Sequence, residues 1–299
     1  WRKGKNGKTK LTVPSTSGAD VVRWGELRQV LAGTTSIIGS GGADGLARNL
    51  DRDNEGLSSP AANYETFPLG DSSGQLIASG CAYPTLPGAD VVSGGNSYLP
   101  HISEGVSREA RNEFLCLSGA QSGAVDIVRR NVAIIHSIGL TAQDAERIAA
   151  NGAVVTWSPR SNISLYGHTA QVTMFDRMRI PIALGTDWTA SGSVNMLREL
   201  RCADSFNKNN LGGYYSDAAL WRMATAVPAR AALSDDSIGE LKAGMLADIA
   251  IFDARGRSAH RAVIEAAPAD VLLVLRGGKA LHGDESLVRA VAADADRGC

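Results

Sequence analysis

The sequence Val132-Ala133-Ile134-Ile135-His136-Ser137 is an apolar run that ends in a histidine, and three similar stretches lie on either side of it. They occupy residues 97–105, 154–162 and 182–187. Each has the pattern of a strand followed by side chains that can bind a metal ion or move a proton. In a parallel β/α barrel the reactive groups lie at the carboxyl ends of the strands, so the four stretches predict one rim that carries chemistry.

Helical patterns separate these predicted strands. They occupy residues 107–117, 172–178, 196–206 and 216–226. The run from Thr141 to Asp144 is similar to a capping box that opens a further helix, and Asn151 and Gly152 end it. The alternation of strands and helices predicts βαβ units.

The first third of the chain is less regular. Residues 24–30 fit a helix and residues 33–38 fit a short β-branched strand, which predicts a helix that leads into a barrel strand. Residues 43–95 are rich in Gly, Ser, Pro and Asn, with one weak strand pattern at 64–69 and a short element at 75–79.

Near Ile238 the composition changes. The stretches 244–253 and 271–279 have strand patterns with glycine turns and no long helix between them. Such strands predict an antiparallel appendage to the barrel. The chain has no internal repeat of fixed period.

Composition and charge limit the class of partner. A chain of 299 residues with 44% hydrophobic residues can form one barrel and an appendage. The net charge is -1, and the only block of one sign is a short basic start from Arg2 to Lys10. This pattern argues against nucleic acid or a membrane as partner, so we expect a small-molecule substrate.

The cysteines bear on the compartment. Cys81, Cys116, Cys202 and Cys299 have neither the spacing of a zinc finger nor the density of a disulfide scaffold. The favoured interpretation is free thiols in a reducing compartment, which predicts a cytoplasmic protein. No stretch approaches the roughly 18 apolar residues of a membrane span, and no signal-peptide pattern is visible.

Three residues at predicted strand ends are candidates for chemistry. A neutral imidazole at His101 suits Zn or Fe, and Glu104 can move protons beside the metal; the alternative is a hydrogen-bonded structural histidine. His136 can ligate a metal, steer water or hold a substrate carbonyl, or it can bond a backbone carbonyl at the rim.

Asp187 lies at the mouth of an apolar strand, where a metal ion would offset the cost of desolvating a carboxylate. It can bind the metal and accept a proton, or it can cap the next helix. The run 158–162 predicts a rigid polar turn, which brings Ser158, Arg160 and Asn162 to the same rim unless it is an ordinary turn.

Aromatic residues near the strand ends, Trp157, Tyr166 and Trp188, indicate a flat ligand, although aromatic side chains at such places often belong to the core. The remaining histidines at positions 168, 260 and 282 are interpreted as structural or solvent-facing.

Taken together, these motifs resemble those of the metal-dependent amidohydrolase superfamily, in particular the branch with cytosine deaminase, chlorohydrolases and adenosine-derivative deaminases. In chain order they are His101-Ile102-Ser103-Glu104, His136-Ser137, Ser158-Pro159-Arg160-Ser161-Asn162, Leu184-Gly185-Thr186-Asp187, Pro228-Ala229-Arg230, Ile238-Gly239 and Gly244-Met245-Leu246-Ala247-Asp248. The resemblance spans residues 33–283.

The resemblance implies an α/β fold, a (β/α)8 TIM-type barrel over residues 1–237, with a small C-terminal β-sandwich segment and a tail over residues 238–299. It implies one divalent metal ion, Zn or else Fe, that activates water for attack on carbon. Barrels of this kind often pair through an exposed flank, so a homo-oligomer is an expected possibility.

The resemblance also implies roles for the candidate residues. His101 and Asp187 would bind the metal, with Asp187 also acting as general base. Glu104 would be the proton shuttle. His136 would orient water or substrate in a mononuclear site, or bind a second metal in a binuclear one. Substrate contacts would come from Ser158, Arg160, Asn162 and Trp188.

One departure from the family pattern concerns the metal ligands. The His-x-His pair that the family carries on its first strand is absent, and the chain opens at Trp1. The first barrel strand and the N-terminal part of the sandwich are therefore expected to be missing, either from an incomplete record or in a degenerate homologue. Residues 95–187 contain no lysine, so a carbamylated lysine between two metals is not expected there.

Two functions follow. The first is a metal-dependent hydrolase, of deaminase or amidohydrolase type, that acts on non-peptide C–N bonds of a small cyclic or heteroaromatic compound with metal-activated water as nucleophile. The alternative is a non-catalytic homologue that binds a small ligand without stable metal. We favour the enzyme, because Glu104 and Asp187 are costly groups to keep at an apolar barrel mouth without chemistry to perform.

Overall fold

The computed structural model describes residues 1–13, 18–39, 41–52 and 54–292. The chain divides into two compact units, each assembled from segments that are distant in sequence. The first unit comprises residues 1–14, 62–193 and 231–233, and the second comprises residues 15–61, 194–230 and 234–299. The predicted domain boundary at residue 238 remains a prediction.

A five-stranded parallel sheet forms the centre of the first unit, in the order β3-β4-β5-β6-β7. Its strands are β3 (Asn63–Glu65), β4 (Tyr98–Ile102), β5 (Ala133–His136), β6 (Val154–Trp157) and β7 (Ile182–Leu184). Spatial order follows chain order, and each connection between neighbouring strands contains a helix, as parallel pairing requires. The predicted α/β class with a parallel sheet is confirmed.

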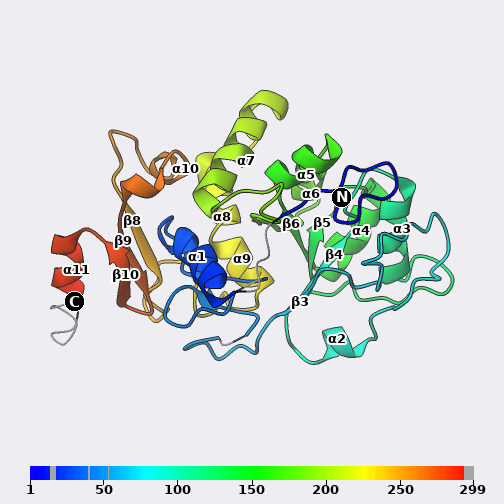
Figure 1. The fold of residues 1–299 in the computed structure, drawn as a ribbon, viewed down its shortest axis with the longest axis horizontal. Helices are drawn as coiled ribbons and strands as arrows, with labels where there is room; N and C mark the ends of the chain where they lie inside the picture. Colours follow the sequence, from blue (N-terminus) through cyan, green and yellow to red (C-terminus); the bar gives the residue numbers. More distant parts are fainter. Residues whose placement is uncertain (14–17, 40, 53, 293–299) are drawn as a thin grey trace. The chain divides into compact units, whose positions relative to one another are not determined.

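The helices of this unit fall between the strands. They are α2 (Asp90–Ser93), α3 (Arg108–Leu117), α4 (Ala142–Asn151), α5 (Pro159–Tyr166) and α6 (Val172–Arg177). The predicted capping box of α4 is confirmed, because the carboxylate of Asp144 accepts the N–H and O–H of Thr141. Gly152 ends α4 in a left-handed conformation with φ 68°. Figure 1 shows α3 and α4 beside β4 and β5.

The core of the first unit is formed by the sheet and the helices against it. All four residues of β5 are buried, as are Tyr98 of β4 and Trp157 of β6. Phe114 of α3 and Phe175 of α6 are also fully buried. Strands that are covered on both faces need continuous apolar sequence, which is why these runs do not alternate with polar residues.

The prediction of a turn at residues 158–162 is wrong, because α5 begins at Pro159. Proline is well suited to the first position of a helix, since its missing N–H would have no partner within the helix. Gly167 ends the helix with φ 65°. The strand predicted at 64–69 is the shorter β3, and residues 75–79 contain no helix or strand.

The second unit contains two small sheets. Strands β1 (Ser36–Ile37) and β2 (Arg48–Asn49) form a parallel pair of their own, so the strand predicted at residues 33–38 does not pair with the five-stranded sheet. Strands β8 (Ile249–Phe252), β9 (Val271–Arg276) and β10 (Lys279–Gly283) form an antiparallel sheet in the order β10-β9-β8. The predicted antiparallel arrangement of the C-terminal strands is confirmed.

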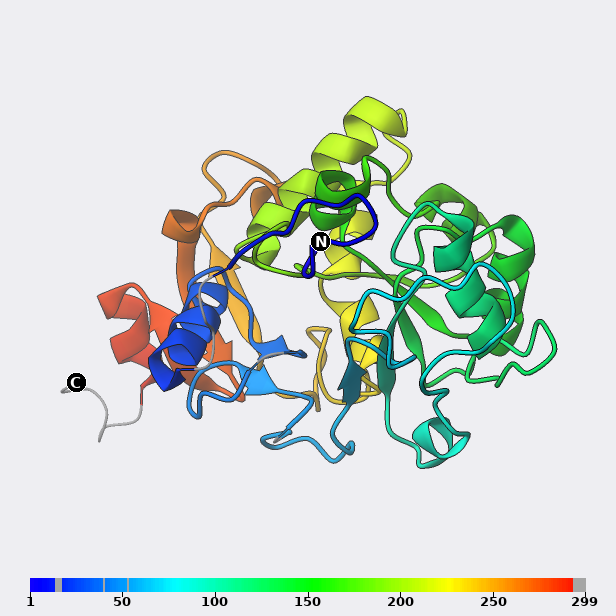
Figure 2. The ribbon, with the colours of Figure 1, turned by 45° about the vertical axis from the view of Figure 1, so that its right-hand side comes forward.

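Helices surround these two sheets. They are α1 (Ala19–Val30), α7 (Met196–Asn210), α8 (Asp217–Met223), α9 (Ala226–Ala231), α10 (Arg261–Ile264) and α11 (Glu285–Val291), with a 3-10 turn at Pro268–Asp270. The helix predicted at 24–30 begins earlier, and the one predicted at 216–226 is divided into α8 and α9. Figure 2 shows α11 beside the antiparallel sheet. Val30, Leu197 and Val274 join α1, α7 and β9 in one buried apolar cluster.

A buried ion pair joins β2 to the segment before β8. Arg48 is 2% exposed and donates two hydrogen bonds to the carboxylate of Asp248, which is 5% exposed. Arg48 also donates to the hydroxyl of Ser36 and the carbonyl of Glu55, and the N–H of Gly277 donates to Asp248. Each charge therefore has several partners, which a buried ion pair needs in order to persist.

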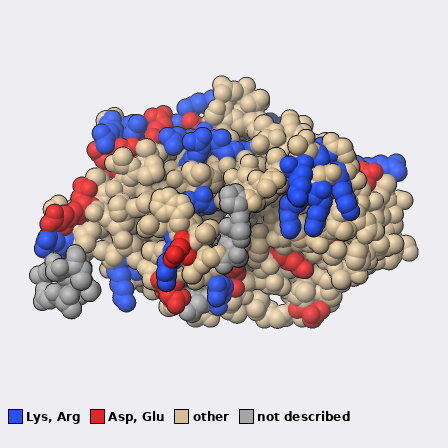
Figure 3. Space-filling model, viewed as in Figure 1, with Lys and Arg blue, Asp and Glu red and all other residues tan. Residues whose placement is uncertain are grey.

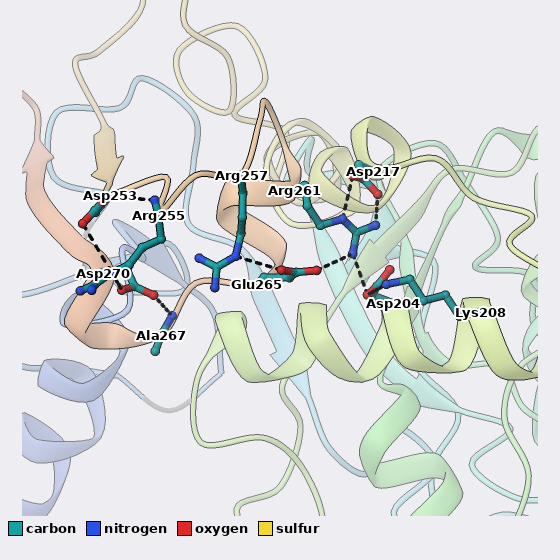
Figure 4. A network of polar contacts seen from close by, with 10 residues as sticks. All are labelled: Asp204, Lys208, Asp217, Asp253, Arg255, Arg257, Arg261, Glu265, Ala267 and Asp270. Carbon is teal, nitrogen blue, oxygen red and sulfur yellow. Dashed lines mark hydrogen bonds and ion pairs between the residues drawn. The ribbon is translucent and has the colours of Figure 1, made fainter.

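A second polar network lies on α7, α8 and α10 (Figure 4). The guanidinium of Arg261 donates to Asp204 of α7 at 2.8 Å and to Asp217 of α8. Lys208 also donates to Asp204, at 2.8 Å. Fork-shaped guanidinium groups bind carboxylates with defined geometry, so Arg261 ties three helices together.

The prediction of free thiols is wrong for two cysteines. Cys81 and Cys116 form a disulfide with a Cα–Cα distance of 5.5 Å, Cys202 is reduced, and Cys299 lies outside the described residues. A single pair of cysteines far apart in the sequence gives no signal that predicts a disulfide, because the fold decides which side chains meet. Disulfides are typical of oxidising compartments, so the cysteines no longer support the predicted cytoplasmic location, which stays a prediction.

Two further surface properties bear on partners. In the described ranges, no helix combines the length and the apolar character that crossing a bilayer requires. Basic side chains on the face in Figure 3 form several separate groups, and the densest lies over the exposed N-terminal segment that includes Arg2 to Lys10.

We expect Asp248→Asn to lower the free energy of unfolding by about 3–5 kcal/mol, because it leaves the Arg48 charge buried without a counter-ion. Urea unfolding followed by circular dichroism measures the change. The control is Asp20→Asn, whose carboxylate pairs with Arg23 on the surface and is 96% exposed, so its loss should cost less than about 1 kcal/mol. Equal effects of the two variants would contradict the structural role of the buried pair.

Reduction of the disulfide should also destabilise the protein. The bond closes a loop with a sequence separation of 35, and the chain-entropy model gives a loss of roughly 3–4 kcal/mol when a loop of this size is opened. Urea unfolding of the Cys81→Ala/Cys116→Ala variant, compared with Cys202→Ala, measures this contribution. An unchanged midpoint in the double variant would show that the bond does not constrain the unfolded chain.

Candidate functional site

Three of the predicted site residues meet at the carboxyl ends of the parallel strands. His101 is in β4, His136 ends β5, and Asp187 follows β7. In the β4–β5 ladder Ile102 pairs with His136, so the two histidines lie at adjacent strand ends with ring centroids 5.0 Å apart. One potential ligand atom from each of the three residues lies within 4.8 Å of the others.

The ring of His101 is oriented by a backbone carbonyl. Its Nδ1 lies 3.0 Å from the carbonyl oxygen of Glu65, at the end of the neighbouring strand β3. A carbonyl can only accept a hydrogen bond, so Nδ1 carries the proton and the neutral ring keeps a bare Nε2. Burial lowers the pKa of His101 to about 4, with a smaller contribution from His136, so the neutral ring is the form present near pH 7.

The ring of His136 is oriented by a chain of buried side chains. Its Nδ1 donates to Oδ1 of Asn162 at 3.2 Å, and the amide nitrogen of Asn162 donates to the hydroxyl of Thr169 at 3.2 Å. The indole N–H of Trp157 donates to the same hydroxyl at 2.7 Å. Nε2 of His136 is buried and has no hydrogen-bond partner among the residues that the structure describes. This imidazole nitrogen is thus available to a ligand.

Asp187 is held by a side chain of α5 and by the backbone of the residue that follows it. Its carboxylate accepts hydrogen bonds from the Ser161 hydroxyl and from the N–H of Trp188, and Oδ2 lies 3.9 Å from Nδ1 of His136. Burial by itself would raise the pKa of Asp187, but His136 and these hydrogen bonds together hold it below its usual value. Asp187 is therefore ionised near neutral pH, and within the described part of the chain its buried Oδ2 has no hydrogen-bond partner.

Glu104 has the opposite character. Its side chain is 33% exposed, Oε2 lies 3.5 Å from Nε2 of His136, and Oε1 accepts the hydroxyl proton of Tyr166 at 3.0 Å. Burial raises the pKa of Glu104, and the charge of Asp187 adds to this effect, while His136 opposes it. The two carboxyl groups of the site are thus pushed in opposite directions, which is the arrangement that separates an acid from a base.

The backbone is strained at the same place. Positive φ angles occur at Ser103 (58°), His136 (78°), Ser137 (55°) and Asp187 (58°). Left-handed backbone disfavours residues with a Cβ, and such residues collect at functional sites where the surrounding structure enforces them. The turns at three strand ends are therefore shaped to direct side chains into the site.

This donor set fits a divalent metal ion. Two imidazoles and one carboxylate are among the ligands that Zn and Fe accept in proteins. The fit rests on two buried atoms that have no hydrogen-bond partner among described residues, Nε2 of His136 and Oδ2 of Asp187. Leaving such atoms without a partner is costly, and a bound cation would remove that cost.

The residues predicted to contact substrate have different positions. Ser158 is buried immediately before α5, and Nε of Arg160 donates to the hydroxyl of Ser193 at 2.9 Å. Both ends of the Asn162 amide are bonded to other side chains, and Trp188 is half-buried next to Asp187. Their contact with a substrate remains a prediction.

Sequence reasoning missed the residues whose hydrogen bonds orient the side chains of the site. Ser161 lies inside a motif that was recognised, but its hydroxyl gave no reason to connect it with Asp187. Thr169 and Glu65 gave no sequence signal, because their contacts depend on how α5 and β3 pack. Residues of this kind can therefore be recognised only when the packing of the strands and helices is known.

Parallel strands that end in two histidines and an aspartate define a class of α/β proteins with a candidate metal centre at one edge of the sheet. The sequence profile of the Amidohydrolase family matches residues 120–282, which is more than half of the chain. The chain belongs to the amidohydrolase family.

Curated relatives agree with this assignment. A 5-methylthioadenosine/S-adenosylhomocysteine deaminase of Clostridium tetani is 33% identical over 165 residues, which are 51% of this chain and 37% of the relative. The protein of the same name from Desulforudis audaxviator is 28% identical over 207 residues, 63% of this chain and 48% of the relative. The chain therefore spans less than half the length of these relatives.

Solved structures show the same fold. An adenosine deaminase from Xanthomonas campestris with bound zinc has a TM-score of 0.54 and 24% identity, with 65% of this chain and 48% of that chain covered. A triazine hydrolase variant has a TM-score of 0.63 and 16% identity, with 91% of this chain and 74% of that chain covered.

We expect Asn162→Leu to weaken binding of a divalent metal ion by about 10- to 100-fold, because His136 loses the acceptor that fixes its proton on Nδ1. Titration with Zn²⁺ against a competing chelator measures the affinity. The control is Asn209→Leu on α7, where the amide is exposed and donates to the hydroxyl of Ser205. Wild-type affinity in Asn162→Leu would show that this amide does not orient His136.

Proposed function

We propose that the protein is a metal-dependent hydrolase that acts on C–N bonds other than peptide bonds in a small heteroaromatic compound. The observation that carries the proposal is the convergence of His101, His136 and Asp187 at one sheet edge, with Glu104 3.5 Å from His136. A site for simple ligand binding does not need two carboxyl groups whose pKa values are pushed apart.

The finer fold is part of the same proposal. We assign the parallel strands to a (β/α)8 TIM-type barrel and the β8–β9–β10 sheet to a small β-sandwich. In support, the strands of the parallel sheet lie in space in the same order as in the sequence, and the fold of a triazine hydrolase covers 91% of this chain. Reactive side chains at the carboxyl ends of the strands are the rule in such barrels.

One divalent metal ion is proposed at this site, with His101 and Asp187 as ligands from this chain and zinc as the favoured ion ahead of iron. When bound, the metal would make water a nucleophile near neutral pH. The support is the mixed nitrogen and oxygen donor set, and the zinc in the related deaminase structure. His136 lies close enough to take part as a further ligand or to orient the water.

The protein's own carboxyl groups are proposed to move the protons. Water adds its oxygen to the ring carbon that carries the nitrogen, and ionised Asp187 accepts the proton released in this step. Glu104, whose raised pKa favours the protonated form, donates a proton to the departing nitrogen as the C–N bond breaks. Ammonia or an amine leaves, and the proton on Asp187 restores Glu104.

The substrate class is proposed from the relatives' names. The curated relatives are named for deamination of 5-methylthioadenosine and S-adenosylhomocysteine, and both are adenosine derivatives. Trp188 beside Asp187 would offer an aromatic face to a purine, and Ser158, Arg160 and Asn162 are retained as proposed contacts. A small molecule with a heteroaromatic amine is therefore the first class to screen.

The test is metal analysis combined with turnover. We expect about one zinc or iron per chain by mass spectrometry, and release of ammonia from an adenosine derivative. Asp187→Asn should abolish turnover with an unchanged circular dichroism spectrum. Glu104→Gln should lower kcat by about 10²–10⁴-fold with little change in KM, because it removes a proton donor rather than a binding contact.

Controls separate these effects from general damage. Asp90→Asn and Glu146→Gln change the same chemical groups at exposed positions of the same unit and should leave kcat unchanged. Near-normal turnover in Asp187→Asn would refute its role. Absence of tightly bound metal in the protein and in any longer product of its reading frame would instead favour the non-catalytic binding protein.

A further inference from the structure

Glu113 is a polar residue of the first unit that none of the proposed catalytic steps uses. It lies in the second turn of α3, whose neighbours Asn112 and Phe114 are buried. Its carboxyl group points back to the end of β4, where Oε2 accepts the backbone N–H of Ser103 at 2.8 Å. The N–H of Glu104 also lies within reach of the same carboxyl group. Two successive backbone donors are thus directed at one side chain.

The segment that Glu113 contacts is a strained turn. Ser103 is fully buried and has φ 58°, a conformation that costs free energy for a residue with a Cβ. Its carbonyl accepts the N–H groups of Gly105 and Ile138, both at 3.0 Å. The carbonyl group of Ser103 is therefore held by the following turn and by the segment after β5, while its N–H group depends on Glu113.

Space around this turn is also restricted. A Cβ at Gly139 would lie 2.8 Å from the carbonyl oxygen of Gly105 and 2.9 Å from the hydroxyl of Ser103. Close packing of this kind leaves the turn few alternative positions as long as its hydrogen bonds are intact. A buried N–H without an acceptor would favour rearrangement instead.

We propose that Glu113 is a positioning residue, which holds the left-handed turn at Ser103 through its backbone N–H and so places the carboxyl group of Glu104 against His136. This inference rests on the proposed role of Glu104 as proton donor. Glu113 itself touches neither the metal-binding residues nor a reacting atom. Its effect on turnover therefore passes through Glu104.

The chemistry of Glu113 suggests a matched pair of variants. Burial raises the pKa of Glu113 to about 8, with a further contribution from Asp71, so the carboxyl group is mainly protonated at pH 7. Glutamine is then close to Glu113 in both shape and charge, and it keeps an oxygen acceptor. Methionine has similar length without an acceptor.

The experiment compares Glu113→Gln and Glu113→Met in the metal-loaded protein. Glu113→Met should lower kcat by about 10- to 100-fold with KM within about twofold, because a displacement of about 1 Å at a catalytic group has effects of this size. Glu113→Gln should keep kcat within about threefold. If the side chain only filled space, Glu113→Gln would not be expected to keep a higher kcat than Glu113→Met.

A double-variant cycle tests whether the effect passes through Glu104. In the Glu104→Gln background, Glu113→Met should lower kcat by less than about threefold, because the group that it positions is already absent. Equal effects of Glu113→Met in both backgrounds would overturn the proposal.

A second measurement is independent of turnover. Hydrogen exchange at the amide of Ser103 should accelerate at least about tenfold in Glu113→Met and stay unchanged in Glu113→Gln, while the amides of α4 keep their protection. Unchanged protection in Glu113→Met would overturn the proposal. If the wild-type protein shows no turnover of any heteroaromatic amine, the proposed function fails, but this exchange result still decides whether Glu113 holds the turn.

A further variant covers the case in which Glu113→Met does not fold. Glu113→Asp keeps the carboxyl group but withdraws it by one methylene from the N–H of Ser103. It should show the same loss of kcat and faster exchange at Ser103, with less perturbation of packing. Wild-type values for both would contradict the positioning role.

Discussion

The site depends on the register between β4 and β5. Both strands are covered on their two faces, so polar side chains are tolerated only where the strands end. Pairing of Ile102 with His136 brings the two strand ends together, and His136, whose φ is 78°, has its ring centroid 5.0 Å from that of His101. A shift in this pairing would move one strand end along the other by about 3.3 Å and separate the two rings. The apolar packing of the strands therefore fixes the chemistry at their ends.

The surrounding hydrogen bonds then decide what these side chains can do. Nδ1 of each histidine is bonded to an oxygen, which leaves each Nε2 available, and Ser161 and Trp188 stabilise the ionised form of Asp187. Burial pushes the pKa of Glu104 upward only a few ångströms away. Two carboxyl groups whose pKa values are pushed in opposite directions thus lie beside two imidazoles, an arrangement that separates an acid from a base.

Sequence patterns predicted the parallel strands, the α4 capping box and the convergence of His101, His136 and Asp187, because apolar periodicity and strand ends are local features. They failed at Pro159, where proline fits a helix start as well as a turn, and at Cys81 and Cys116, which meet only in the fold. The contacts of Ser161, Thr169 and Glu113 join segments whose approach no local pattern encodes.

Residues with left-handed backbone angles show how local sequence preference and tertiary contacts together determine the site. Ser103, His136 and Asp187 adopt backbone angles that their own side chains disfavour, so local propensity opposes the geometry that the site requires. The opposition is overcome by contacts from outside the site, such as the carboxyl of Glu113 on Ser103 and the hydroxyl of Ser161 on Asp187. If the proposed function holds, the residues that support the turns are as necessary to the chemistry as the groups that would face a metal, and a substitution among them would remove function while the sheet stays intact.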